Sequence, residues 1–559
     1  KQLYFMTMLP VTGVKDANGQ DVPLAEVDYY GYTFAELTFS EVLAPGAEMT
    51  FTFSMAGTPE CASGGTIDVN LCFFGNPTYL MMSSILLPSS ISGDFATFEL
   101  DVSVPAGLTI ASSGVTKAVA PSIAKPGWEV HHIVQDFRTD SSSMGIAPYV
   151  VASLPMNGRK INVFTLEDSL VEETVPGVIK TMRDVIQFYS DHFGPFLFPK
   201  MDACQVTQDA GAAFGWPALL WIPDVMFLAG TGGYSTDEEE VENERYSLFA
   251  HELGHQWFPD ILMNNDDMAA WLSEGFAEFS SIRFMASRLG EEYAKGVYDS
   301  YAYMYMYFVD PADDYGLTSM AAQQVSNAMV YQIVTYYKGA AVAEMLRLAI
   351  GDSAFYGAIQ DLYEDYAGQE KYYNTSILQT YFEKTHGQSL SWFFNQWIYG
   401  KGFPKYEVTV TRAKGDGGKD VVRVGVKRGA NIEGLTFSMP VGLAIVTQKG
   451  ETVHAETIDQ DVMTFTYELD SPLVRVRFDP DRTFWKRVSG ALPGDLDLSG
   501  DVDAIDLLYT QWAFDSQPWG QGSRHFVSGA DFDFDADVDA DDLAKVTDNL
   551  GRNSDEVAR

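Results

Sequence analysis

Residues 251–255 read His251-Glu252-Leu253-Gly254-His255, and eighteen residues separate this stretch from Glu274. Side chains four residues apart share one face of a helix, so His251 and His255 can direct both imidazoles at a single ion. Zinc takes four N, O or S ligands, and a catalytic zinc keeps one of the four positions open for water. Two histidines and one distant carboxylate therefore predict a catalytic zinc site.

Glu252 stands one step round the helix from His251, where it can reach a water on the ion rather than the ion itself. We therefore expect it to act as a general base. Short motifs of this kind also occur by chance, as two ordinary core histidines on one helix. The apolar residues on either side, 248–250 and 257–258, predict a half-buried helix. Buried polar groups without a partner are costly, so zinc is the favoured explanation.

The wider window resembles the zinc metallopeptidases of the aminopeptidase-N type, a branch of the thermolysin-like gluzincins. Residues 271–277 (WLSEGFA) match the family phrase that carries the third zinc ligand, and residues 336–339 (YYKG) match its tyrosine phrase. The resemblance implies zinc held by His251, His255 and Glu274. It also implies Tyr336 as the phenol that stabilises the oxyanion, with Tyr337 as the competing choice.

One family motif is altered in this chain. Aminopeptidases of this type carry a G-x-M-E-N or M-E-Y-P-G phrase, whose glutamate holds the free amino group of the substrate. Residues 211–221 correspond to it, and Phe214 or Gly215 takes the place of the glutamate, depending on the alignment. The candidate substrate-binding residues are Ala213, Phe214, Gly215 and Trp216.

An ammonium group needs an anion to offset its desolvation. The acids nearest to the altered motif in sequence, Asp209 and Asp224, flank it rather than lie within it. We therefore expect intact zinc chemistry together with altered recognition of the N-terminal amine, on a floor of apolar side chains.

A second motif lies near the C-terminus, where residues 495–506 repeat as residues 531–542. Oxygen ligands at loop positions 1, 3, 5 and 12, with a backbone carbonyl at position 7, form a calcium cage of the EF-hand kind. Gly500 supplies the sharp turn at position 6 of the first loop, and Ala536 replaces it in the second. The predicted ligands of calcium 1 are Asp495, Asp497, Ser499, Asp501 and Asp506; those of calcium 2 are Asp531, Asp533, Asp535, Asp537 and Asp542.

Each loop is followed by the start of a helix, and position 12 is Asp. Loop plus helix, twice, resembles a dockerin, the duplicated calcium module that plugs into a cohesin domain. Residues 490–559 hold 16 acidic against 4 basic residues. Carboxylates in two matched registers favour calcium over a disordered acidic tail. Two functions stay open: docking to a cohesin-like partner, or a calcium-stabilised terminal domain without one.

The 559 residues predict a multidomain protein. Alternating strand-like sequence at both ends of the chain surrounds a stretch of helical spacing. The N-terminal block is shorter than the corresponding family domain, so we expect it to be incomplete. The predicted domains are an N-terminal β-sheet domain (1–158), a thermolysin-like α+β catalytic domain (159–403), a small β-sandwich (404–488) and an α-helical dockerin-like tail (489–559).

The net charge of −41 argues against nucleic acid or anionic lipid as a partner. No stretch approaches eighteen uninterrupted apolar residues, so no membrane span is expected. The first residue is Lys1 rather than Met, which we interpret as a mature form whose signal peptide has been removed, secreted or held at the cell surface. Cys61 and Cys72 could pair in an exported protein, whereas Cys204 lies in an apolar run and is expected to be a buried thiol.

Together these features predict an exported zinc metallopeptidase that hydrolyses peptide bonds of a peptide or protein substrate with an activated water. One alternative is an endopeptidase acting on blocked or internal peptide bonds. The other is a non-catalytic binding protein of the gluzincin fold, presented by its dockerin-like tail. The presence of Glu252 favours an enzyme.

Overall fold

The computed structural model separates into two compact units, Lys1–Met263 with Tyr363–Tyr372, and Asn264–Leu362 with Tyr373–Arg559. Among the described residues, no helix is both long enough and apolar enough to cross a bilayer. The structure describes residues 2–6, 9–29, 32–39, 44, 46–57, 72–74, 79–82, 89–90, 95–139, 141–166, 175–206, 213–224, 238–265, 269–319, 327–415, 418–429, 436–517, 530–533 and 535–553.

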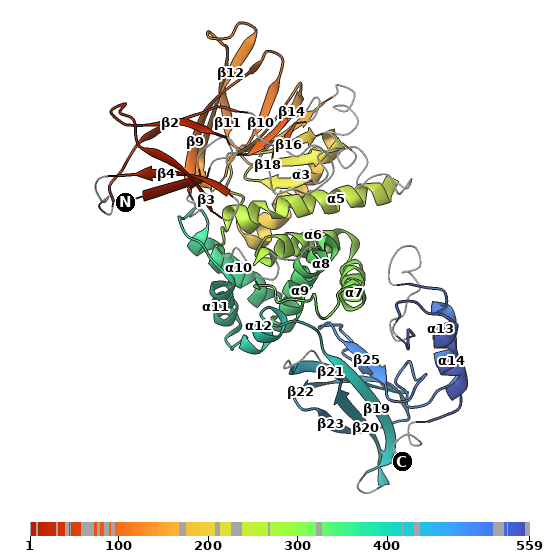
Figure 1. Cartoon of the computed structure of the whole chain (residues 1–559). Coiled ribbons are helices and arrows are strands. Elements are labelled where there is room, and N and C mark those ends of the chain that lie inside the picture. Colours follow the sequence, from red (N-terminus) through yellow and green to blue (C-terminus); the bar gives the residue numbers. More distant parts are fainter. Residues whose placement is uncertain are drawn as a thin grey trace. The chain divides into compact units, whose positions relative to one another are not determined.

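The first unit opens with the expected β domain (Figure 1). Its strands form four sheets, with the orders β3-β4-β1-β8, β2-β5, β10-β13-β7-β6 and β11-β12-β9. Exposure alternates along β9, as the sequence pattern predicts for strands with one buried face. The strands are β1 (Gln2–Met6), β2 (Val11–Asp16), β3 (Leu24–Tyr29), β4 (Tyr32–Thr38), β5 (Phe51–Met55), β6 (Cys72–Phe74), β7 (Tyr79–Met82), β8 (Ser89–Ser90), β9 (Ala96–Pro105), β10 (Thr109–Ser112), β11 (Val115–Pro121), β12 (Trp128–Thr139) and β13 (Ser143–Ala147).

A five-stranded mixed sheet, in the order β14-β15-β16-β18-β17, carries the rest of this unit. Two of its three inner strands, β16 and β18, are buried along their whole length, because both of their faces are covered. Helix α3 packs against β15 (Figure 1). The histidine motif lies at the C-terminal end of helix α5, and His255 directly follows the last residue of that helix, Gly254. The elements are β14 (Val150–Met156), β15 (Arg159–Thr165), α3 (Val175–Phe193), β16 (Lys200–Val206), β17 (Phe214–Trp216), β18 (Leu219–Pro223), α5 (Glu238–Gly254) and the kinked segment η2 (Gln256–Ile261).

The predicted boundary between residues 158 and 159 falls inside a hairpin of this sheet. Strands β14 and β15 pair antiparallel over Val150–Met156 and Arg159–Thr165. Strand β14, which the sequence placed in the N-terminal domain, therefore shares a sheet with strands of the second predicted domain. Alternation in a single strand does not reveal its partner, because pairing is decided by register across the sheet.

The second unit begins with a helical region. Its core helices, α6 and α9, approach each other unusually closely, because each presents a glycine at the crossing. A Cβ added to Gly275 would lie 3.0 Å from Cα of Gly339, and the reverse distance is also 3.0 Å. The elements are η3 (Ala270–Leu272), α6 (Glu274–Leu289), α7 (Glu291–Phe308), α8 (Ala328–Tyr331), the π-helical turn η5 (Gln332–Lys338), α9 (Gly339–Ile350), α10 (Asp352–Tyr366, which runs on into the first unit), α11 (Thr375–His386) and α12 (Ser391–Trp397).

A buried polar network fixes the start of α9. Lys338 is fully buried, and its ammonium donates to the Tyr305 hydroxyl at 3.1 Å and lies 3.8 Å from Asp314. Tyr305 in turn donates to Asp314 at 2.6 Å, and the Gly402 amide donates to the same carboxylate oxygen at 2.7 Å. Burial lowers the pKa of Lys338, and the Asp314 carboxylate opposes that shift. The lysine of the tyrosine phrase is therefore a structural residue.

The chain ends in two further sheets and two short helices. The sheets have the orders β23-β20-β19-β25 and β22-β21-β24. The region expected to be a small β-sandwich is thus made of strands. The elements are β19 (Lys405–Lys414), β20 (Asp420–Arg428), β21 (Met439–Thr447), β22 (Gly450–Ile458), β23 (Val462–Glu468), β24 (Leu473–Phe478), β25 (Arg487–Gly490), α13 (Ala504–Ala513) and α14 (Ala540–Asn549).

Candidate functional site

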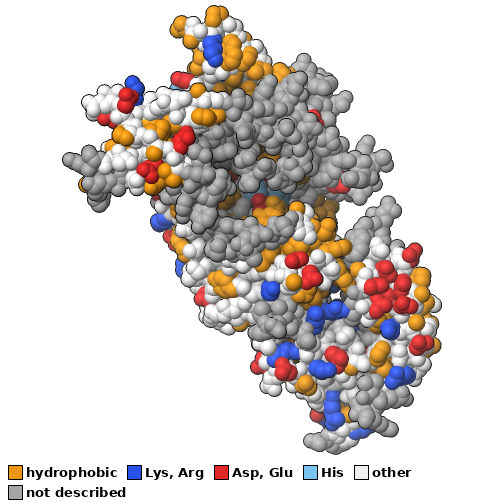
Figure 2. All heavy atoms as spheres, in the orientation of Figure 1, with side chains coloured by type: hydrophobic (Ala, Val, Ile, Leu, Met, Phe, Trp, Pro, Cys, Tyr) orange, Lys and Arg blue, Asp and Glu red, His pale blue; other side chains and the backbone are white. Residues whose placement is uncertain are grey.

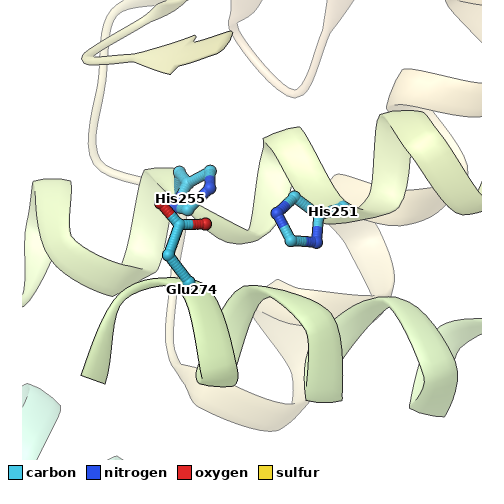
Figure 3. A group of neighbouring side chains, drawn as sticks. All are labelled: His251, His255 and Glu274. Carbon is cyan, nitrogen blue, oxygen red and sulfur yellow. The ribbon is translucent and has the colours of Figure 1, made fainter. Parts of the chain in front are cut away.

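The three predicted zinc ligands come together. His251 and His255 offer one nitrogen each and Glu274 a carboxylate oxygen, and these atoms all lie within 4.8 Å of one another (Figure 3). Zinc bonds of about 2.0–2.2 Å place two ligand atoms at most about 4.4 Å apart. A small side-chain adjustment therefore gives the spacing that one zinc ion requires, and two nitrogens with one oxygen form a donor set that zinc favours.

Groups outside the ligand set orient His255. This side chain is only 8% exposed, and its Nδ1 lies 3.0 Å from the Phe258 carbonyl oxygen. A ring nitrogen that donates to a carbonyl fixes the tautomer and leaves Nε2 free to bind a metal. Glu252 is also buried, at 6% exposed, on the same helix. The base predicted from the sequence is thus held in the protein interior.

The edge strand β17 packs directly against α5, the helix that carries His251 and Glu252 and that we call the zinc helix. A Cβ added to Gly215 would lie 2.4 Å from the carbonyl oxygen of Glu252 and 3.0 Å from Cβ of His255. No side chain fits in that space unless the strand or the helix moves. Gly215 is therefore required by close packing against the predicted base Glu252 and the predicted zinc ligand His255.

Gln256 stabilises the packing of β17 against the zinc helix, a role that its position in the sequence did not reveal. This fully buried side chain donates to the Trp216 carbonyl at 2.8 Å and accepts from the Ala218 amide at 2.8 Å. It thereby satisfies two backbone groups in the turn between β17 and β18. The signal in the sequence is a glutamine between His255 and the apolar pair at residues 257–258.

Phe214 and Trp216 do not face the zinc helix as Gly215 does. Successive side chains of a strand point to opposite faces. The two rings stack at 6.1 Å, and both make edge contacts with Trp221 in a cluster with the inner strands. The aromatic pair therefore packs into that cluster. Its role in substrate binding, like that of Ala213, stays a prediction.

Of the two acids that flank the altered motif, Asp209 and Asp224, the structure describes only Asp224. Asp224 accepts a hydrogen bond from the Gln205 side chain at 2.8 Å, so it has a structural partner. Asp209 lies outside the described residues. Between residues 213 and 224, the described part of this stretch holds no carboxylate other than Asp224.

Tyr336 and Tyr337 lie in η5, just before the glycine crossing of α6 and α9. Tyr337 stacks face to face on Tyr301 of α7, with ring centroids 4.0 Å apart and planes 13° apart. Tyr301 in turn donates a hydrogen bond to Glu278. Tyr337 is therefore committed to packing, which favours Tyr336 as the phenol near the reaction. π-Helical turns recur at functional sites, and η5 is of this kind, whereas η2 is kinked at Phe258, whose φ of −127° and ψ of 93° are not helical.

The two C-terminal loops share one hydrogen-bond plan. In the first, Asp506 accepts from the amides of Leu496 at 2.8 Å and Asp503 at 2.8 Å. In the second, Asp542 accepts from those of Phe532 at 2.5 Å and Asp539 at 2.9 Å. Asp503 and Asp539 each cap the following helix in a reciprocal capping box. The repeat in the sequence is thus a repeat in structure.

The acidic side chains of these loops gather in three groups within possible ligand spacing of one another. These are Asp495, Asp497 and Asp506; Asp531, Asp533 and Asp535; and Asp537, Asp539 and Asp542. Burial and then repulsion from Asp506 raise the pKa of Asp495 to about 7. A bound cation would relieve that crowding, and oxygen-only donors suit calcium.

The remaining predicted ligands have other partners. The Ser499 hydroxyl donates to the Asp501 carbonyl at 3.1 Å, while the Asp501 carboxylate accepts from Arg412 at 2.6 Å. Asp501 stands at loop position 7, where an EF-hand uses the backbone carbonyl. Its side chain is thus free to form an ion pair without weakening the fit to calcium.

Gly500 and Ala536 adopt the same left-handed backbone at position 6, with φ of 87° and 79°. Glycine reaches this region without steric cost, whereas an L-residue with a Cβ is strained there by roughly 1–2 kcal/mol. The second loop therefore forms the same turn as the first but carries backbone strain at Ala536.

Cys204 is fully buried in β16, and burial raises the pKa of its thiol to about 12, as expected of an inert core cysteine. Cys61 lies outside the described residues, so its predicted pairing with Cys72 stays a prediction.

Residues 178–397 match the family model of the Peptidase family M1 domain. Similar curated proteins include a probable aminopeptidase 2 of Sulfurisphaera tokodaii, 28% identical over 44% of this chain and 32% of that protein. Others are the tricorn protease-interacting factor F2 of Thermoplasma volcanium (24% identical, 66% of this chain and 45% of that protein) and human aminopeptidase N (21%, 55% and 33%).

A crystal structure of Legionella pneumophila aminopeptidase A in complex with aspartic acid shares the fold, with a TM-score of 0.69 at 14% identity. The alignment covers 91% of this chain and 57% of that one. The chain spans less than half the length of the three curated relatives named above. The segment that is similar to the M1 domain carries all three predicted zinc ligands, His251, His255 and Glu274.

Gly215→Ala should lower both zinc content and thermal stability, because the added methyl collides with the Glu252 carbonyl. Overpacking of this kind costs about 1–3 kcal/mol. Gly296→Ala in α7 is the matched control, since nothing lies within 4 Å of its added Cβ. Elemental analysis and thermal unfolding of both variants measure the effect. Equal zinc content and equal melting temperatures would contradict the close-packing argument.

Ala536→Gly should stabilise the calcium-loaded C-terminal repeat, because it removes the strain at φ 79°. The gain should be about 0.5–1 kcal/mol, since the greater backbone entropy of unfolded glycine offsets part of the relief. The reciprocal change, Gly500→Ala, should destabilise the first loop. Hydrogen exchange of amides in α13 and α14 at saturating calcium reports both. Faster exchange in α14 after Ala536→Gly would show that the residue is not strained.

Proposed function

We propose that this chain, whose residues 178–397 match the M1 domain, is an exported zinc-dependent peptidase that hydrolyses peptide bonds with reduced dependence on a free N-terminal amine. The observation that carries the zinc chemistry is the convergence of His251, His255 and Glu274 within 4.8 Å. The buried Glu252 on the same helix supports an enzyme over a non-catalytic binding protein, because a protein that only binds has no use for the base.

His251, His255 and Glu274 would hold the zinc ion, which when bound acidifies water and polarises the scissile carbonyl. Glu252 takes the proton from the attacking water and delivers it to the leaving amine. Tyr336 donates a hydrogen bond to the oxygen on which negative charge develops, a contribution that is large in a water-poor site. Gln256 and Gly215 position the strand along which the peptide would lie.

Altered amine recognition is supported by the sequence of β17. No carboxylate stands at residues 213–217, and the nearby Asp224 is already bonded to Gln205. An ammonium group desolvated there would lack a counter-charge. The same observation favours the second candidate, an endopeptidase acting on blocked or internal bonds, and the relative rates on free and blocked peptides separate the two.

For the C-terminal repeat we propose two bound calcium ions and a docking role toward a cohesin-like domain. The shared hydrogen-bond plan of the two loops and their crowded carboxylates support calcium. Loops of this kind in extracellular modules bind calcium weakly and fill only where calcium is abundant, which supports export.

Glu252→Gln should keep about one zinc ion per chain and lower kcat about a hundredfold or more, because it removes the general base without removing a ligand. Glu242→Gln, an exposed position on the same helix, is the matched control and should leave kcat unchanged. Elemental analysis and single-turnover kinetics on a fluorogenic peptide give both readouts. Unchanged turnover in Glu252→Gln would remove Glu252 from the mechanism.

The ratio of cleavage rates for a free peptide and its N-acetylated form should lie far closer to one than in an ordinary aminopeptidase. The physical reason is that the amine meets no carboxylate from β17. Both peptides are compared at equal concentration with the wild-type enzyme. A strong preference for the free amine would mean that another acid has taken over the role of the missing glutamate.

A further inference from the structure

Helix α13 displays an inverted pattern of polarity. Its exposed side chains include Ile505 (46% exposed), Leu508 (64%), Tyr509 (41%) and Trp512 (54%). Their spacing of three, four and seven residues puts them on one face. The residues that α13 buries are Asp506, Thr510 and Ala513. The helix therefore turns Asp506 toward the first loop and four large apolar side chains outward, while Leu507 packs partly buried against the core of the repeat.

The second repeat shows that this apolar face is not needed for the fold. Thirty-six residues further on, α14 also buries its inward positions, Asp542 and Val546. The positions that correspond to the apolar face are Asp541, Ala544, Lys545 and Asp548. Both helices thus share the loop, the capping box and the inward aspartate. Along its length α13 presents four large apolar side chains to the outside and α14 presents none, while one exposed apolar residue, Phe514 or Leu550, follows each helix.

A face of this kind on a soluble chain points to a protein partner. Contiguous exposed apolar side chains mark interaction sites, and Trp and Tyr are enriched among the residues that dominate binding energy. Phe514 (45% exposed), just beyond the end of α13, adds to the exposed apolar residues. We define the α13 face as Ile505, Leu508, Tyr509, Trp512 and Phe514.

Charge restricts the identity of that partner. Exposed Asp503 and Asp515 stand at the two ends of α13, and residues 490–559 carry 16 acidic against 4 basic residues. Figure 2 shows red side chains gathered where Figure 1 draws α13 and α14, with orange side chains beside them. A second copy would bring the same acidic surroundings and a net charge of −41, and the two would repel. A partner with lysines and arginines around an apolar centre is complementary.

We propose that the α13 face, and not the corresponding face of α14, is the docking surface for a cohesin-like domain whose contact surface is apolar at its centre and basic at its rim. This proposal rests on the docking role proposed above for the C-terminal repeat. It adds that only one of the two helices of the repeat contacts the partner. Docking then has a single orientation, although the repeat itself is duplicated.

The test uses the full-length chain with calcium and a panel of purified cohesin domains as probes, with affinity measured by titration calorimetry. Leu508→Ala and Trp512→Ala should each weaken binding at least about 30-fold, as expected for central apolar anchors. The matched controls on α14 are Ala544→Gly and Asp548→Ala, which should change affinity less than about threefold. Added salt should slow association, because the rim contacts are electrostatic.

Circular dichroism, calcium content and peptidase activity, all unchanged in the four variants, would exclude unfolding as the cause of any loss. Binding that depends on α14 rather than α13 would overturn the one-sided surface but leave the docking role intact. The absence of binding to every domain in the panel would overturn both.

Two further measurements on the free, calcium-loaded chain exclude other occupants. A dimer in light scattering that Trp512→Ala dissociates would mean that a second copy covers the α13 face. Protection of Trp512 from hydroxyl-radical labelling in the monomer would mean that another segment of the chain covers it. Either outcome overturns the proposal, whereas a monomer with labelled Trp512 that binds through α13 supports it.

Discussion

The contact of β17 with the zinc helix is the constraint on which the site depends. At Gly215 the strand approaches the Glu252 carbonyl so closely that even a methyl group would lie 2.4 Å from it. Gln256 holds the strand there through two hydrogen bonds of 2.8 Å to the backbone. The zinc helix therefore cannot shift without disturbing the edge strand. This coupling gives preorganisation, since residues that bind a metal or move a proton work only when their supports are rigid.

A second close approach lies within the other unit, next to Glu274. Gly275 directly follows the zinc ligand Glu274, and Gly339 comes three residues after Tyr336. A Cβ added to either glycine would lie only 3.0 Å from the Cα of the other, so α6 and α9 pack closely because both lack one, and the buried Lys338–Asp314 pair holds the start of α9. Removing one partner of such a pair typically costs about 3–5 kcal/mol, so the residues beside Tyr336 tolerate little change. Gly275, Gly339 and the buried Lys338 therefore fix the positions of α6 and α9.

The C-terminal repeat follows a different principle. Its carboxylates are crowded and partly desolvated, and burial together with repulsion from Asp506 raises the pKa of Asp495 to about 7. The two repeats share the aspartates that accept hydrogen bonds from the loop amides, Asp506 and Asp542, and they differ in the side chains that their helices expose. Strain at Ala536 shows that the copies have diverged inside the loop as well.

The sequence alone determined the residues whose chemistry depends on local spacing. His251 and His255 share a helix face at any tertiary position, and the two loops hold their ligands within twelve residues, so both could be predicted from the chain. The N-terminal strands were likewise recognised by alternation. Strand pairing and side-chain packing depend on partners distant in sequence, so only the tertiary structure decided them. The pairing of β14 with β15 moved a strand across the predicted boundary, and the stack on Tyr301 separated Tyr337 from Tyr336. The packing of β17 on the zinc helix gave Gly215 and Gln256 their roles and turned Phe214 and Trp216 toward Trp221. Local periodicity reports which face of an element is apolar, but not which element will cover it.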